Sequence, residues 1–166
     1  MVMTPKSDML ATRFEAKVRE AASVLERLSD ADWKKTTTAE KWTVGVTAHH
    51  LALAFEAVSR IATALASGQP RGQQFTRAML DDLNARHAEE HAACTKSETL
   101  PLFQKNATGA ASVVRGLRDA ELARNGIVFD DAPPMTAEQL ITLGLIQHID
   151  EHMRSIRETV GATGTS

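Results

Sequence analysis

The sequence predicts an all-α protein, a bundle of four long helices, or of five if a short polar break separates the third helix from the fourth. Apolar residues recur at helical spacing over most of the 166 residues, and Ala, Leu, Glu and Arg, which favour helices, are abundant. The strand-like stretch 127–135 is too short to make a sheet. We expect one domain over residues 1–166, with a frayed tail over about 161–166.

The first half of the chain carries the signals of two helices. A Thr-Pro pair at residues 4–5 is typical of a helix start, and apolar residues continue at helical spacing to about residue 29. The polar segment that follows is expected to be a loop in which Trp33 folds back onto the core. Thr43 is then placed to cap a second helix that runs to about residue 67.

The second half is expected to hold the remaining helices. One covers about residues 75–93, and Ser97 is placed to cap another over residues 98–122, with Pro101 in its first turn. The pair Asn125–Gly126 is expected to end that helix.

The last helix is the most clearly marked. Thr136 and Gln139 have the spacing of a capping box, and an apolar face follows them to about Gly161.

Composition limits the kinds of partner that we expect. Lys and Arg total 19 against 21 Asp and Glu, so the chain lacks the excess positive charge of a nucleic-acid-binding protein. No apolar run reaches the length that spans a bilayer, and no signal peptide is recognised. The single cysteine, Cys94, excludes an intrachain disulfide and fits a reducing, cytoplasmic location.

Three histidines are the strongest candidates for a functional site. His148 and His152 are four residues apart, so both rings lie on one face of the last helix. That face also carries Leu145 and Ile149, and burying two imidazoles without partners would be costly. A divalent metal would satisfy both rings, and His50, on the buried side of the second helix, is the best candidate for a third ligand.

Other polar residues near these three have more open roles. Glu151 is expected to accept a hydrogen bond from an imidazole, to act as a base beside a metal-bound water, or to be a solvated surface carboxylate. His49 lies at the edge of the buried face next to His50. His87 and His91 share the same spacing, but their segment is polar, and we interpret them as mostly solvated.

Three segments in this order resemble the DinB-like superfamily of metal-binding four-helix bundles, which includes the YfiT-like proteins and the mycothiol-dependent isomerases. They are LSDADW at residues 28–33, WTVGVTAHHLALAFE at 42–56 and QHIDEH at 147–152. In that family a Trp-Ser/Thr pair opens the second helix and a metal-binding histidine follows eight residues after the Trp, which is His50 here. The resemblance likewise implies His148 and His152 as ligands, with His49 as a neighbour of the site.

The resemblance implies an enzyme that uses Zn²⁺ or Ni²⁺ to activate water or a low-molecular-weight thiol such as mycothiol or bacillithiol. The reaction on the small-molecule substrate would be hydrolysis, or a thiol-dependent transfer or isomerisation. It also implies a homodimer. A non-enzymatic, stress-related binding protein with a structural or adventitious metal is the alternative, and a third possibility is that the histidines are hydrogen-bonded in the core without metal.

Overall fold

The computed structural model describes residues 3–69 and 73–161 and confirms the all-α class. In chain order the elements are α1 (Lys6–Glu26), α2 (Asp30–Trp33), α3 (Val44–Ser67), α4 (Arg77–Glu90), α5 (Lys96–Arg115), α6 (Asp119–Leu122), β1 (Asn125–Gly126), β2 (Met135–Thr136), α7 (Ala137–Ile141), the π-helical segment η1 (Thr142–Gln147) and α8 (His148–Gly161).

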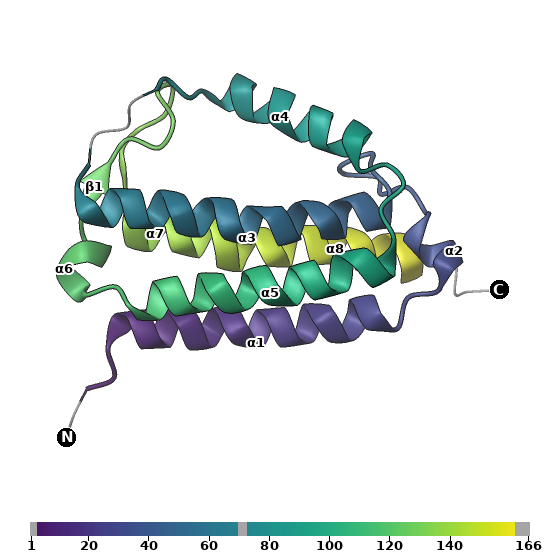
Figure 1. Cartoon of the computed structure of the whole chain (residues 1–166), viewed down its shortest axis with the longest axis horizontal. Helices are drawn as coiled ribbons and strands as arrows, with labels where there is room; N and C mark the ends of the chain where they lie inside the picture. The colour runs from purple at the N-terminus through teal and green to yellow at the C-terminus, as the bar shows by residue number, and fades with distance from the viewer. Residues whose placement is uncertain (1–2, 70–72, 162–166) are drawn as a thin grey trace.

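Four long rods form the bundle: α1, α3, α5 and the continuous run α7–η1–α8, while α4 crosses outside α3 (Figure 1). Three fully buried phenylalanines, one each from α1, α3 and α5, join these helices at the centre. The ring of Phe55 contacts that of Phe14 at a centroid distance of 5.2 Å and that of Phe103 at 5.0 Å, both edge to face. Each buried side chain of this size contributes about 1.5–3 kcal/mol of hydrophobic stabilisation, so this cluster sets the position of α3.

The start of α3 is fixed as the sequence predicts. The hydroxyl of Thr43 accepts a hydrogen bond from the amide of Val46 at 3.1 Å. The loop before it folds back, so that Trp33 is buried and its indole N–H donates to the carbonyl of Cys94 at 2.9 Å. Trp33 packs so closely on α3 that a Cβ at Gly45 would lie 2.3 Å from the indole nitrogen, which requires glycine there.

The predicted helix over residues 98–122 is wrong at both ends. Thr95, not Ser97, caps α5 and forms a capping box with Glu98, so Pro101 lies in the second turn rather than the first. The helix ends at Arg115, and the short α6 follows after a break.

Asn125–Gly126 also differs from its expected role as a helix end. These two residues form β1 and pair antiparallel with Met135–Thr136, which closes the intervening loop. The pairing takes up backbone hydrogen bonds that a helix end would leave to solvent. The capping box of Thr136 and Gln139 then starts α7 as predicted.

The last rod is not a continuous α-helix, which the sequence did not indicate. Its middle, η1, is π-helical and ends at the residue before His148. Gly144 in η1 lies against α3, where an added Cβ would come within 2.9 Å of the Val58 side chain. Single π-turns inside α-helices occur frequently at functional sites. The predicted tail beyond Gly161 lies outside the described residues.

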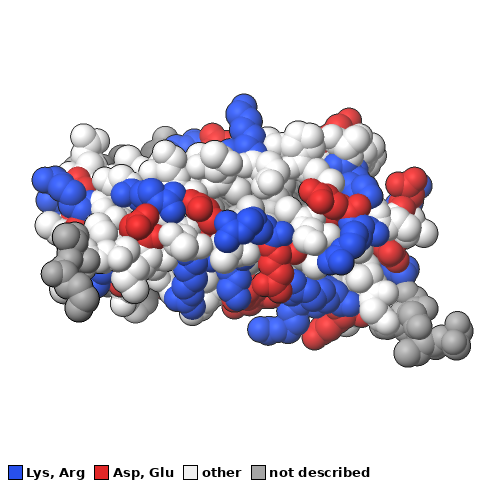
Figure 2. All heavy atoms as spheres, turned by 90° about the horizontal axis from the view of Figure 1, so that it is seen from below, with Lys and Arg blue, Asp and Glu red and all other residues white. Residues whose placement is uncertain are grey.

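The surface over α1 is mixed in charge (Figure 2). Lys and Arg lie among Asp and Glu, with ion pairs such as Arg115–Asp8 and Lys17–Asp150, both at 2.8 Å. Neither sign dominates this face. Over residues 3–69 and 73–161, no helix combines the length and the apolar content that crossing a membrane requires.

Candidate metal centre

The structure brings His50, His148 and His152 together between α3 and α8. The Nε2 atom of His148 lies 3.2 Å from Nε2 of His50 and 2.8 Å from Nε2 of His152. One ligand atom from each ring lies within 4.8 Å of the other two. Around a tetrahedral ion with metal–nitrogen distances of 2.0–2.1 Å, nitrogens lie about 3.3 Å apart, so the three rings are close to a coordinating arrangement.

A carboxylate holds one of these rings in place. Glu40, in the loop before α3, accepts a hydrogen bond from Nδ1 of His152 at 2.7 Å through one oxygen and from the hydroxyl of Ser155 through the other. The side chains of His152 and Glu40 are only 14% and 11% exposed. This carboxylate–histidine pair is the arrangement that fixes the tautomer of a metal-binding imidazole.

The loop that presents Glu40 is itself fixed. The amide of Thr37 donates to the carbonyl of Trp42 at 2.8 Å, and the amide of Lys41 donates to the carbonyl of Thr37 at 3.1 Å. Lys41 has a φ of 61°, a left-handed conformation that is uncommon outside glycine. Burial disfavours ionisation of Glu40, but hydrogen bonds from Ser155, Thr37 and His152 outweigh it and lower the pKa of its carboxyl.

The hydrogen bonds that His152 and His148 make elsewhere leave the Nε2 lone pairs of these two rings facing each other. Because Nδ1 of His152 faces a carboxylate, its proton lies there and Nε2 carries a lone pair. The His148 side chain also hydrogen-bonds the backbone of Gly144, one turn earlier. Burial, followed by the neighbouring histidines, lowers the pKa of His50 to about 2 and that of His148 to about 4, so both are neutral at pH 7. Facing lone pairs repel, and a cation between them removes that repulsion.

Glu151 does not take a bonding position beside these rings. It is exposed, because consecutive residues on an α-helix point about 100° apart and His152 faces inward. The carboxylate that contacts His152 is Glu40 instead. Sequence reasoning missed Glu40 because it stands in a polar loop without periodicity, 112 residues from the histidine that it contacts.

His49, His87 and His91 form a second cluster, and the expectation that His87 and His91 are mostly solvated is wrong. Both are half-buried, and one ligand atom from each of the three rings lies within 4.8 Å of the others. Burial, followed by the two neighbouring rings, lowers the pKa of His87 to about 4. The signal was their four-residue spacing, which the polar composition of the segment masked.

Three surface hollows lie away from the two histidine clusters. One lies between α1 and α5 around Val18 and Ala111, one by the loop around Pro133, and one where Ile61 and Leu65 face the loop around Ile127. None of these three hollows is lined by a histidine, so they do not mark the histidine clusters.

The fold is a four-helix bundle in which three histidines from α3 and α8 converge. Residues 14–145 match the model of the mycothiol maleylpyruvate isomerase N-terminal domain, and the chain belongs to this family, within the DinB-like superfamily. Among curated protein sequences, no significant relative is found.

Two solved structures share the fold. YfiT from Bacillus subtilis, described as a probable metal-dependent hydrolase with an unusual four-helix bundle topology, aligns with a TM-score of 0.76 and 19% identity over 100% of this chain and 92% of its own. A histidine-to-alanine variant of the mycothiol-dependent maleylpyruvate isomerase aligns with a TM-score of 0.73 and 9% identity over 93% of this chain. This chain spans 63% of the length of that isomerase.

Proposed function

We propose that His50, His148 and His152 bind one divalent ion, Zn²⁺ or Ni²⁺, and that the protein is a metal-dependent enzyme acting on a small molecule. The observation that carries the proposal is the convergence of three imidazole nitrogens, one ring being held by the largely buried carboxylate of Glu40. Imidazole is a preferred ligand of both ions.

The number of ligands supports an open site. Structural zinc sites normally have four protein ligands, whereas catalytic sites have three and leave a position for water or substrate. Among the described residues, the group around His148 contains three ligand side chains. Neither Glu151, which is exposed, nor His49, which lies in the other cluster, belongs to it. A fourth protein ligand would have favoured the structural role of the binding-protein alternative.

The protein's own residues would prepare the site in two ways. Glu40 keeps a proton on Nδ1 of His152 and orients the ring. Its negative charge also makes Nε2 of that imidazole more basic, and so a stronger electron-pair donor to the ion. Burial keeps His50 and His148 neutral, so binding need not displace protons from them at pH 7. When bound, the ion would supply Lewis-acid activation of water or of a low-molecular-weight thiol.

The two relatives define which reactions to test. One is described as a hydrolase and the other as a mycothiol-dependent isomerase. The question is therefore whether the ion would activate water or a thiol. Assays of hydrolysis and of thiol addition, with and without mycothiol or bacillithiol, would answer it. The homodimer and the cytoplasmic location stay predictions.

Metal analysis of protein purified without an affinity tag tests the first step. We expect His148→Ala to lose one equivalent of Zn²⁺ or Ni²⁺ relative to the unmodified protein, and His91→Ala to retain the ion at this site. Equal metal content in His148→Ala and the unmodified protein, after dialysis against buffered metal, would refute the proposed site.

A further inference from the structure

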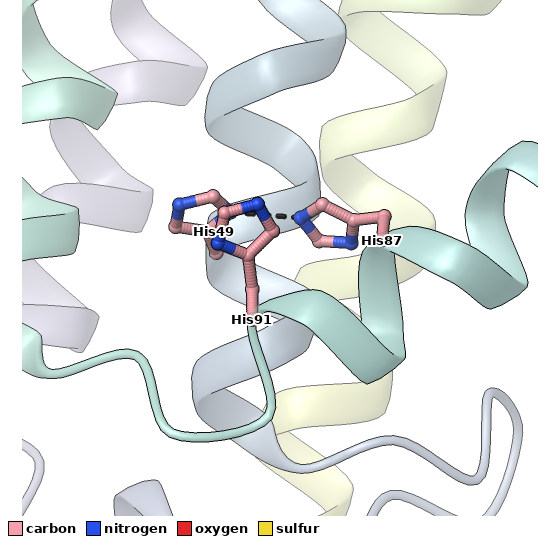
Figure 3. A group of neighbouring side chains, drawn as sticks. All are labelled: His49, His87 and His91. Atoms are coloured by element: carbon pink, nitrogen blue, oxygen red, sulfur yellow. Dashed lines mark hydrogen bonds between the residues drawn. The ribbon is translucent and has the colours of Figure 1, made fainter.

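The second histidine cluster joins the bundle to the outlying helix α4. His49 projects from α3, next in the chain to His50, while His87 lies in the last turn of α4 and His91 is the residue that ends it. Figure 3 shows the rings from α4 reaching toward that of His49. The three histidines therefore come from segments about 40 residues apart and meet in space.

The geometry is as compact as that of the first cluster. Nδ1 of His49 lies 2.7 Å from Nε2 of His87. The His91 ring stacks on that of His49 at a centroid distance of 4.1 Å and lies 4.8 Å from that of His87. With His87 and His91 four residues apart on one helical face, a third ring from another helix completes the three-ligand arrangement that binds imidazole-preferring ions.

Hydrogen bonding alone does not satisfy this cluster. His49 is 8% exposed, and its contact with His87 uses one nitrogen of each ring. Among the described residues, Nδ1 of His87 is buried and has no hydrogen-bond partner. A buried polar atom without a partner is costly and commonly indicates an ion or water that completes the site.

The packing of α4 gives the cluster a structural role. None of the 14 residues of α4 is buried, and Met79 and Leu83 are exposed. At its start, Phe75 hydrogen-bonds Asp130 and stacks on Phe129. At its end, the side-chain contacts include those of His87 and His91 with His49. No fully buried side chain of α4 therefore anchors this helix on α3.

We propose that His49, His87 and His91 form a second binding site for a divalent cation of the imidazole-preferring class, such as Zn²⁺, which links α4 to α3. The two sites are neighbours, since the rings of His50 and His87 are 5.9 Å apart between centroids. Occupancy of the second site sets how firmly α4 lies over the side of the bundle that carries His50. This second site does not depend on the enzymatic role proposed for the first.

Equilibrium dialysis against buffered Zn²⁺ separates the two sites. We expect two equivalents in the unmodified protein, one in His91→Ala, one in His148→Ala and none in the double variant. Because His91 follows the last residue of α4 and is not part of the buried core, its replacement should leave the bundle core intact, and circular dichroism checks the fold. His87→Ala should reproduce the result of His91→Ala.

Hydrogen exchange supplies a readout that adventitious binding would not give. Adding Zn²⁺ should slow amide exchange over residues 77–90 in the unmodified protein and in His148→Ala, but not in His91→Ala. Slower exchange of α4 in His91→Ala to the same extent would contradict the proposed link.

Each alternative outcome is distinct. If the unmodified protein binds one equivalent of Zn²⁺, and His148→Ala loses it while His91→Ala keeps it, the second site is refuted and the first remains. One equivalent with the reverse pattern would establish the second site and overturn the proposed function. Weak, non-saturating uptake that neither replacement changes would mean adventitious binding only and would refute both.

Discussion

The two histidine clusters lie side by side but are supported in different ways. His50, His148 and His152 stand on two helices of the packed bundle, and the largely buried carboxylate of Glu40 orients the ring of His152. His49, His87 and His91 join one bundle helix to a helix without a buried residue. The same residue type at similar spacing therefore stands on well-packed helices in one place, and joins a well-packed helix to a loosely packed one in the other.

The difference in packing between the bundle and α4 should have its largest effect on the free energy of unfolding. Phe55→Ala, at the centre of the bundle, is expected to lower the free energy of unfolding by about 3–5 kcal/mol, because it leaves a cavity between three helices. Leu83→Ala on the exposed side of α4 should change it by less than about 0.5 kcal/mol. Urea unfolding measures both, and a comparable loss in Leu83→Ala would show that α4 is part of the core.

Removing a ligand tests the first site. His152→Ala is expected to weaken binding at the first site at least about 100-fold, since loss of a ligand should exceed the 10–100-fold cost of losing a partner that orients one. His91→Ala is the matched control, with the same replacement in the other cluster. Isothermal titration with Zn²⁺ measures the affinities, and an unchanged first-site affinity in His152→Ala would exclude His152 as a ligand.

Replacing Glu40, the carboxylate that hydrogen-bonds His152, should weaken metal binding less than replacing the histidine itself. Glu40→Gln keeps the size of the side chain but removes its charge, and we expect binding at the first site to weaken about 10–100-fold. Glu151→Gln is the control, because Glu151 is exposed one residue before His152. Equal effects of the two replacements would mean that general surface charge, and not this hydrogen bond, is responsible.

Acid should destabilise the metal-free protein through both clusters. Burial lowers the pKa of His50 to about 2 and those of His148 and His87 to about 4, whereas an unfolded histidine titrates near 6.5. Below pH 6.5 the unfolded chain binds more protons, so the free energy of unfolding falls as pH decreases toward 4, by at most about 1.4 kcal/mol per pH unit for each such group.

Two replacements divide that pH dependence between the clusters. Chelator-treated His50→Asn and His87→Asn should each show a shallower loss of stability between pH 6.5 and 4 than the unmodified protein. Urea unfolding at several pH values measures the slopes. Slopes that neither replacement reduces would show that other groups control acid unfolding.

Local signals predicted most of the fold. Thr43 and the Thr136–Gln139 capping box mark helix starts that the structure confirms, because these bonds form between residues three apart. The start of α5 was misplaced by two residues because Thr95 and Ser97 are both good caps, and the reciprocal bond from Glu98 selects Thr95. The π-helical turn before His148 had no local signal; Gly144 lies close against Val58, a contact with α3 that the sequence does not reveal.

The convergence of His50, His148 and His152 was predictable from their spacing and apolar neighbours, but the expected burial of the adjacent pair was wrong: His49 is buried and His50 is only partly so. Glu40 was not predictable, since it reaches His152 from 112 residues away through a loop.

The cluster of His49, His87 and His91 was not predicted, for a related reason. The polar residues around His87 and His91 belong to the side of α4 that faces solvent. Only the position of α4 in the fold reveals that its other side contacts His49.

The most direct test of the central claim is the metal content of untagged protein, compared between the unmodified chain and His148→Ala after dialysis against buffered Zn²⁺. The convergence of His50, His148 and His152 predicts that His148→Ala loses one equivalent. Identical content in both proteins, with no thermal shift on adding Zn²⁺ or Ni²⁺ to either, would contradict the account.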